Sequence, residues 1–148
     1  MEKTEFLKAA GKGDYTVVHK MLAQGIDADT HEEGGRGRTA MMRACRHGHT
    51  DIVRLLLEKG ADVNKQDAFG DTALTYAACN GYMDIVKLLL EHGAGTEIRN
   101  NAGRTVLEEV GAELLCGPSL TDEELSEAQK QYWDIITMCR QHTRQQGT

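Results

Sequence analysis

The sequence repeats itself at a fixed step of 33 residues, and this periodicity constrains the fold more than any other feature. Thr39, Thr72 and Thr105 follow one another at that step. When residues 37–69 are set against residues 70–102, fourteen of the 33 pairs are identical. A fixed period of this size is typical of a solenoid, in which stacked units together bury apolar surface that one unit alone leaves exposed.

Each period predicts two short helices. Residues 39–45 are small and apolar on one side, which suits a first helix packed closely against its neighbours, and Gly48 is expected to end it. We expect Thr50 or Asp51 to cap the second helix, because a short oxygen side chain accepts hydrogen bonds from free backbone N–H groups. The leucine-rich stretch 52–57 forms an apolar arc too wide for a helix with one buried face, so neighbouring repeats must cover it on two sides.

Glycine and Asx residues predict the loops of the repeat. Gly60 lies where the second helix needs a left-handed C-terminal residue. Residues 64–70 and 97–103 supply the glycine and Asx turn residues of two hairpin tips. Each repeat is therefore expected to end in a projecting finger.

The segment 48–64, which reads Gly-His-Thr-Asp-Ile-Val-Arg-Leu-Leu-Leu-Glu-Lys-Gly-Ala-Asp-Val-Asn, resembles the ankyrin-repeat family. The resemblance implies an all-α solenoid of helix-turn-helix units with hairpin fingers, which binds partner proteins and is not an enzyme. One departure is that the family's Thr-Pro-Leu-His opening is absent at 39–42, 72–75 and 105–108. We expect the fold to survive, with lower stability than a regular array.

Both ends of the chain are predicted to act as caps. The polar His19 and Lys20 in the first repeat, and Arg140 near the C-terminus, occupy positions that are expected to face outward. Thr121 and Glu124 form a capping box, so a long helix is expected over 121–142 to close the stack. We expect one domain over 1–148, with repeats at about 4–38, 39–71, 72–104 and 105–142, an insertion at about 116–132 and a frayed tail at 143–148.

Composition and motifs narrow the function classes. A net charge of −6 disfavours nucleic acid as a partner, and the chain has no apolar run long enough to cross a membrane. No phosphate loop, nucleophile motif or metal-ligand set occurs, so we expect no catalysis, cofactor or metal, and we assign His47 and His49 to a turn rather than to a metal site. A charged N-terminus and four cysteines without redox spacing predict a reducing compartment, the cytoplasm by default, with the nucleus left open.

The resemblance places a partner-binding surface on the concave face, which the fingers and the exposed sides of the first helices form together. Six arginines and one lysine fall on this face of an acidic chain, with Phe69 and Tyr76 as expected aromatic anchors and Lys12, Ala68 and Cys79 beside them. Such a surface suits an acidic partner segment that carries an apolar residue. The alternative, that these arginines are a solvated surface, stays open. The expected partner-binding residues are Arg36, Arg38, Arg43, Arg46, His47, Gln66, Phe69, Asp71, Tyr76, Asn80, Arg99, Asn101 and Arg104.

Two interpretations of this surface follow. In the first, a monomeric chain is a non-catalytic adaptor or scaffold that binds a partner protein. In the second, the chain is a stoichiometric inhibitor or regulator of an enzyme or cytoskeletal complex, since it consists almost entirely of repeats. The single tryptophan, Trp133, is expected to pack within the last helix rather than to contact a partner.

Overall fold

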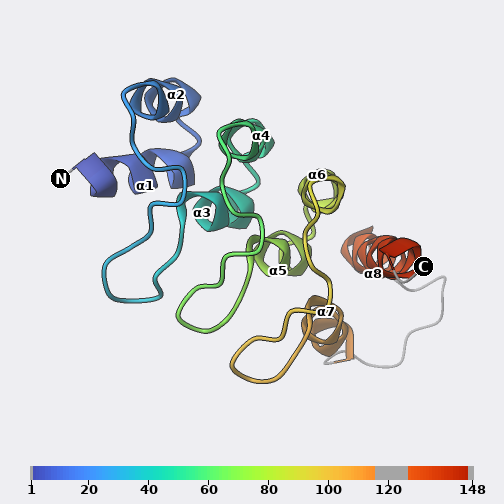
Figure 1. The fold of residues 1–148 in the computed structure, drawn as a ribbon. Coiled ribbons are helices and arrows are strands. Elements are labelled where there is room, and N and C mark those ends of the chain that lie inside the picture. Colours follow the sequence, from blue (N-terminus) through green and yellow to red (C-terminus); the bar gives the residue numbers. More distant parts are fainter. Residues whose placement is uncertain (1, 116–126, 147–148) are drawn as a thin grey trace.

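The structure, a computed structural model, describes residues 2–115 and 127–146. Of the side chains in these ranges, those of 111–115, 127–129, 131–133 and 145–146 are not described. The described part is all-helical, which confirms the predicted fold class (Figure 1). Its helices are α1 (Glu2–Lys12), α2 (Tyr15–Ala23), α3 (Ala40–His47), α4 (Thr50–Glu58), α5 (Ala73–Cys79), α6 (Met83–Glu91), α7 (Val106–Leu115) and α8 (Glu127–Gln146).

The helices lie in two rows, and the loops project from one side of them (Figure 1). The first helices α1, α3, α5 and α7 form one row, and α2, α4 and α6 form the other. The first helices pack more closely on one another than the second helices do. Such a difference in spacing is expected to curve the stack toward the first helices, so that their exposed sides and the fingers share one face.

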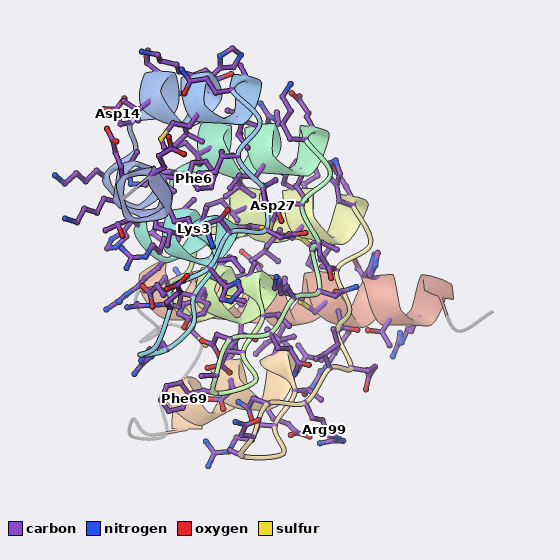
Figure 2. All side chains as sticks on the ribbon, turned by 60° about the vertical axis from the view of Figure 1, so that its left-hand side comes forward. Lys3, Phe6, Asp14, Asp27, Phe69 and Arg99 are labelled. Carbon is purple, nitrogen blue, oxygen red and sulfur yellow. The ribbon has the colours of Figure 1, made fainter. Side chains whose placement is uncertain are left out.

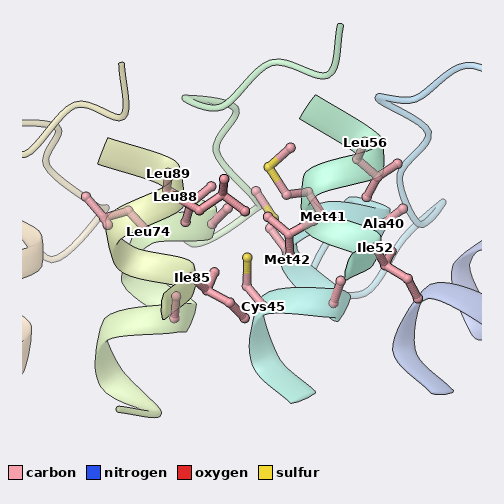
Figure 3. Packing of buried hydrophobic residues seen from close by; sticks show 14 of the residues in the cluster. Ala40, Met41, Met42, Cys45, Ile52, Leu56, Leu74, Ile85, Leu88 and Leu89 are labelled. Carbon is pink, nitrogen blue, oxygen red and sulfur yellow. The ribbon is translucent and has the colours of Figure 1, made fainter. Parts of the chain in front are cut away.

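Alanines allow the close approach within the first row. Ala40, Ala44 and Ala77 are fully buried in α3 and α5. The second row supplies larger side chains, and Ile52 and Leu56 of α4 are almost completely inaccessible to solvent. Figure 3 shows Ile52 and Leu56 on the side of α4 toward the preceding repeat, and Ile85 and Leu88 of α6 beside Met42 and Cys45 of α3. These side chains belong to one buried core, and the predicted burial of the leucine-rich helices between neighbouring repeats is confirmed.

The ends of the helices follow the predictions in part. Thr39 caps α3, since its Oγ1 accepts a hydrogen bond from the Met42 N–H at 3.2 Å, and Gly48 ends that helix with a φ of 77°. The expectation that Thr50 or Asp51 caps α4 is wrong. The N-terminal cap position is His49, which makes no capping hydrogen bond with its side chain.

His49 instead joins two repeats. Its ring lies against Gly13, where an added Cβ would come within 2.6 Å of it, and His49 Nε2 donates a hydrogen bond to the Gly11 carbonyl at 2.9 Å. One repeat later, the ring of Tyr82 occupies the same place above Gly48. The side chains of His49 and Tyr82, which precede α4 and α6, therefore pack against the preceding repeat and do not cap their own helices.

The C-terminal helix closes the stack against α5, α6 and α7. Arg140 is exposed, and so are His19 and Lys20 at the other end, as predicted for caps. A frayed tail is expected at 143–148, and α8 continues through this region as far as Gln146. Thr143 helps to hold this part, since its Oγ1 donates to the Cys139 carbonyl at 2.9 Å and also pairs with Thr96 Oγ1. The predicted capping box at Thr121 and Glu124 and the side chain of Trp133 lie outside the described residues.

Candidate protein-binding surface

The three fingers are joined to one another by backbone hydrogen bonds. The Ala68 N–H donates to the Arg36 carbonyl at 2.8 Å, and one repeat later the Asn101 N–H donates to the Phe69 carbonyl at 2.9 Å. Asn101 Nδ2 adds a bond to the Ala68 carbonyl at 2.8 Å. The finger tips therefore form a continuous row along the stack instead of moving independently.

Each finger is also closed at its base by an acceptor side chain. Asp67 Oδ1 accepts hydrogen bonds from the N–H groups of Phe69 and Asp71, at 2.9 and 3.0 Å. Asn100, which is 33 residues later, accepts equivalent bonds from the N–H groups of Ala102 and Arg104. Glu32 holds the same place in the longer first finger, where its carboxylate accepts from the Arg38 N–H. These three acceptors are not among the predicted site residues, although their spacing of 35 and then 33 residues is a signal that could have found them.

The same acceptors fasten each finger to the first helix that follows it. In each repeat the partner is a side chain at one equivalent position of that helix, in the first or second turn. The Tyr76 hydroxyl donates to Asp67 Oδ2 at 2.5 Å, and Asn100 Nδ2 donates to Glu109 Oε1 at 2.7 Å. The three finger–helix pairs are Glu32–Arg43, Asp67–Tyr76 and Asn100–Glu109.

Two predicted binding residues, Arg38 and Arg43, both pair with Glu32. Arg38 Nε lies 3.6 Å from Glu32 Oε1, and the Arg43 guanidinium makes a direct hydrogen bond to the same oxygen. Burial by itself would raise the pKa of the Glu32 carboxyl, but the Arg43 hydrogen bond and charge, with those of Arg38, hold that pKa below its usual value. The two arginines therefore have a role inside the protein, where they stabilise the first finger through Glu32.

Tyr76 has a similar internal role. Burial and the hydrogen bond to Asp67 raise the pKa of its hydroxyl to about 12, so this group stays protonated and keeps donating. The side chain is half-buried, whereas Phe69 has half of its surface exposed. Of the two expected aromatic anchors, only Phe69 is open to a partner.

The other predicted side chains make contacts inside the protein, and those of Asp71 and Gln66 reach the next finger. Asp71 accepts from Asn100 Nδ2 at 3.1 Å, and burial raises the pKa of its carboxyl. Gln66 Nε2 donates to the carbonyls of Gly70 and Arg99, at 2.9 and 3.1 Å. The Arg99 guanidinium donates to the Gly103 carbonyl at 2.7 Å and pairs with Glu108 at 3.4 Å, while Arg104 pairs with Glu109 at 3.9 Å. Asn80 Nδ2 donates to the Tyr76 carbonyl at 2.7 Å.

Four of the predicted side chains remain open. The Arg36 guanidinium lies over the Phe69 ring, 4.8 Å from its centroid, at the tips of two neighbouring fingers. Figure 2 shows Phe69 at the tip of the second finger. Arg46 and His47 are exposed in the last turn of α3. Burial, followed by the nearby charges of Arg46, His49, Arg38 and Arg43, lowers the pKa of His47.

Other kinds of site find little support in the described part of the chain. No group of three or more His, Cys, Asp or Glu side chains there could hold a metal ion. Burial raises the pKa of the Cys45 thiol and raises that of Cys139 to about 11, so both favour the unreactive protonated form. None of the described helices combines the length and apolar character needed to cross a membrane.

Comparison with known sequences places these features in a family. Residues 6–107, well over half of the chain, match the sequence model for ankyrin repeats in three copies. The chain belongs to the ankyrin-repeat family. The helix pairs and fingers described above are this family's repeating unit, and the predicted resemblance is confirmed.

The similarity of this ankyrin-repeat chain to individual curated proteins is confined to a few repeats. It is 43% identical over 58 residues to inversin of Danio rerio, which covers 39% of this chain and 6% of inversin. It is 45% identical over 49 residues to the probable E3 ubiquitin-protein ligase XBOS33 of Oryza sativa subsp. japonica, which covers 33% of this chain and 9% of that protein. The chain therefore spans less than a tenth of the length of the curated relatives it matches.

Proposed function

We propose that the chain binds a partner protein on the face formed by its fingers and first helices, and that it acts as a non-catalytic adaptor or scaffold. Ankyrin repeats are in general protein–protein interaction modules. The partner segment that suits this face carries acidic residues beside an apolar one. We include in the proposal that the chain is monomeric and works in the cytoplasm or the nucleus.

The observation that carries the proposal is that the open side chains are of the kinds that dominate interfaces. Arg36 and Phe69 stand together at the finger tips while most of the predicted polar groups around them are engaged internally. Arginine and aromatic residues are enriched among binding hot spots, and a rigid row of fingers holds them without a further ordering cost. A solvated surface would not require an exposed phenylalanine.

Partner capture with matched variants tests the proposal. Phe69→Ala and Arg46→Glu should each weaken binding of a captured protein by about 1–4 kcal/mol, and both should leave the helical circular dichroism unchanged. Tyr15→Ala and Arg54→Glu are the controls, since Tyr15 on α2 is 45% exposed and Arg54 on α4 is exposed, both in the second row. Unchanged binding by the first two variants, or equal loss in the controls, would move the site off the concave face.

The inhibitor hypothesis uses the same surface and differs in its consequence. A stoichiometric regulator recovers one enzyme or filament complex and lowers its activity at a one-to-one ratio. An adaptor recovers a partner whose activity does not change. An activity titration of the captured complex therefore separates the two functions.

A further inference from the structure

The exposed sides of the first helices change their charge along the stack. The repeat aligns Arg43 and His47 of α3 with Lys8 and Lys12 of α1, and both lysines are exposed. One repeat in the other direction, the equivalent side chains of α5 are uncharged, and at α7 the aligned residue is acidic. These positions are Lys8 and Lys12, Arg43 and His47, Tyr76 and Asn80, and Glu109.

Three basic side chains at the α1–α3 end are not paired with an acid in the described part of the chain. Lys8, Lys12 and Arg46 form no ion pair with any residue in the described ranges. Glu32, one of the carboxylates at this end, is shared between two arginines, which leaves one of those two positive charges unbalanced. Figure 2 shows nitrogen-tipped side chains projecting beside α1 and α3. Burial is the largest cause of the lowered pKa of His47, and the charges of three nearby arginines lower it further.

The opposite end of the face is neutralised. Glu108 accepts from the Thr105 N–H at 3.1 Å and pairs with Arg99 at 3.4 Å, while Glu109 pairs with Arg104 at 3.9 Å. Because each of these two acids has a basic neighbour, the four charges cancel among the side chains that the structure describes at this end. Among the described side chains of the first helices, the basic ones without an ion pair lie at the α1–α3 end, on a chain whose overall charge is −6.

We infer that the face holds its partner segment in one direction, with the acidic residues over α1 and α3 and the apolar residue against Phe69. The inference rests on the proposed function and names Lys8, Lys12 and Arg46 as the residues that set the direction. Complementary charges across an interface fix register and raise the association rate more than they add affinity. A segment bound in the opposite direction would place its acidic residues over the paired charges at the α7 end and would gain no such attraction.

Paramagnetic NMR with a synthetic probe tests the direction. The probe is a twelve-residue peptide with three glutamates at one end, a central leucine and a Gly-Ser tail, and it carries a nitroxide at either the acidic end or the tail. With ¹⁵N-labelled protein, the acidic-end label is expected to broaden the amides of 8–13 and 43–49, and the tail label those of 103–110. Broadening of 103–110 by the acidic-end label overturns the inference.

Charge variants give an independent readout of the same binding. Lys12→Glu combined with Arg46→Glu should weaken the acidic peptide at least about tenfold at low salt, and added salt should shrink this difference. Lys87→Glu, at an exposed position of α6, is the matched control and should change little. A peptide with glutamines in place of the glutamates should lose most of the affinity.

The possible failures point to different parts of the account. Equal binding of the glutamate and glutamine peptides at the finger row overturns the charge-directed orientation and leaves the proposed function standing. No broadening on the concave face by either probe also overturns the inference. A captured partner whose binding ignores Phe69→Ala and Arg46→Glu removes the proposed function itself.

Discussion

Gly70→Ala is expected to separate the second and third fingers. Gly70 has a φ of 80°, where an alanine costs about 1–2 kcal/mol of backbone strain. Its new Cβ would also lie 2.8 Å from both Asn100 Cα and Asn101 N, so the backbone of the third finger must move. That movement weakens the two hydrogen bonds of Asn101 to the second finger, each worth about 0.5–1.5 kcal/mol. Gly70→Ala is therefore expected to lower the free energy of unfolding by about 2–5 kcal/mol.

Gly103→Ala provides the matched control one repeat later. Gly103 has a φ of 77°, but an added Cβ there meets no atom within 4 Å. Gly103→Ala should therefore lower the free energy of unfolding only by the cost of backbone strain, about 1–2 kcal/mol. The difference between the two variants, about 1–3 kcal/mol, measures the contact between fingers.

Urea unfolding followed by circular dichroism measures both free energies of unfolding. For a chain of this size, each kcal/mol also lowers Tm by about 2–4 °C, which gives a second readout. Equal losses in Gly70→Ala and Gly103→Ala would refute the reasoning, since the fingers would then not form a joined row. The partner-binding proposal would lose the rigid support of its tip residues.

Three further predictions address the finger base, the core and the thiols. Glu32 has a lowered pKa in the folded state, so the stability that its carboxylate contributes is fully present above a pH of about 4.5. This contribution is lost as the pH falls through the lower pKa of the folded state. Glu32→Gln should therefore flatten that part of the acid-unfolding curve, and an unchanged curve would contradict the ion-pair assignment. Leu56→Ala should cost about 2–5 kcal/mol in urea unfolding, and the half-buried Leu57→Ala clearly less. Cys45 should react with a thiol reagent only after unfolding, since it is fully buried; labelling of the native chain at Cys45, detected by peptide mass spectrometry, would show an open core.

The fold could be predicted from the sequence because burial alone demands it. Leucine-rich helices at a constant step need neighbours on two sides, and Ile52 and Leu56 are buried as this requires. The helix starts were less predictable. His49 takes the cap position because its ring is used against Gly13 of the preceding repeat, and no local propensity rule describes such a contact.

The site could be predicted only as a set of positions. Whether an arginine is available depends on an acid elsewhere in the chain, and Glu32 lies 11 residues before Arg43. Aligning the first finger with the later ones through its two extra residues brings Glu32 into register with Asp67 and Asn100. With that alignment, the finger–helix pairs follow from the periodicity.

Hydrogen exchange on the captured complex tests the central claim most directly, since it maps the contact without mutation. Protection is expected at the finger tips around Phe69 and at the end of α3 from Arg43 to Gly48, which together carry the open side chains. The second helices α2, α4 and α6 should exchange as in the free chain. Protection confined to those second helices would contradict the proposal that partners bind on the face of fingers and first helices.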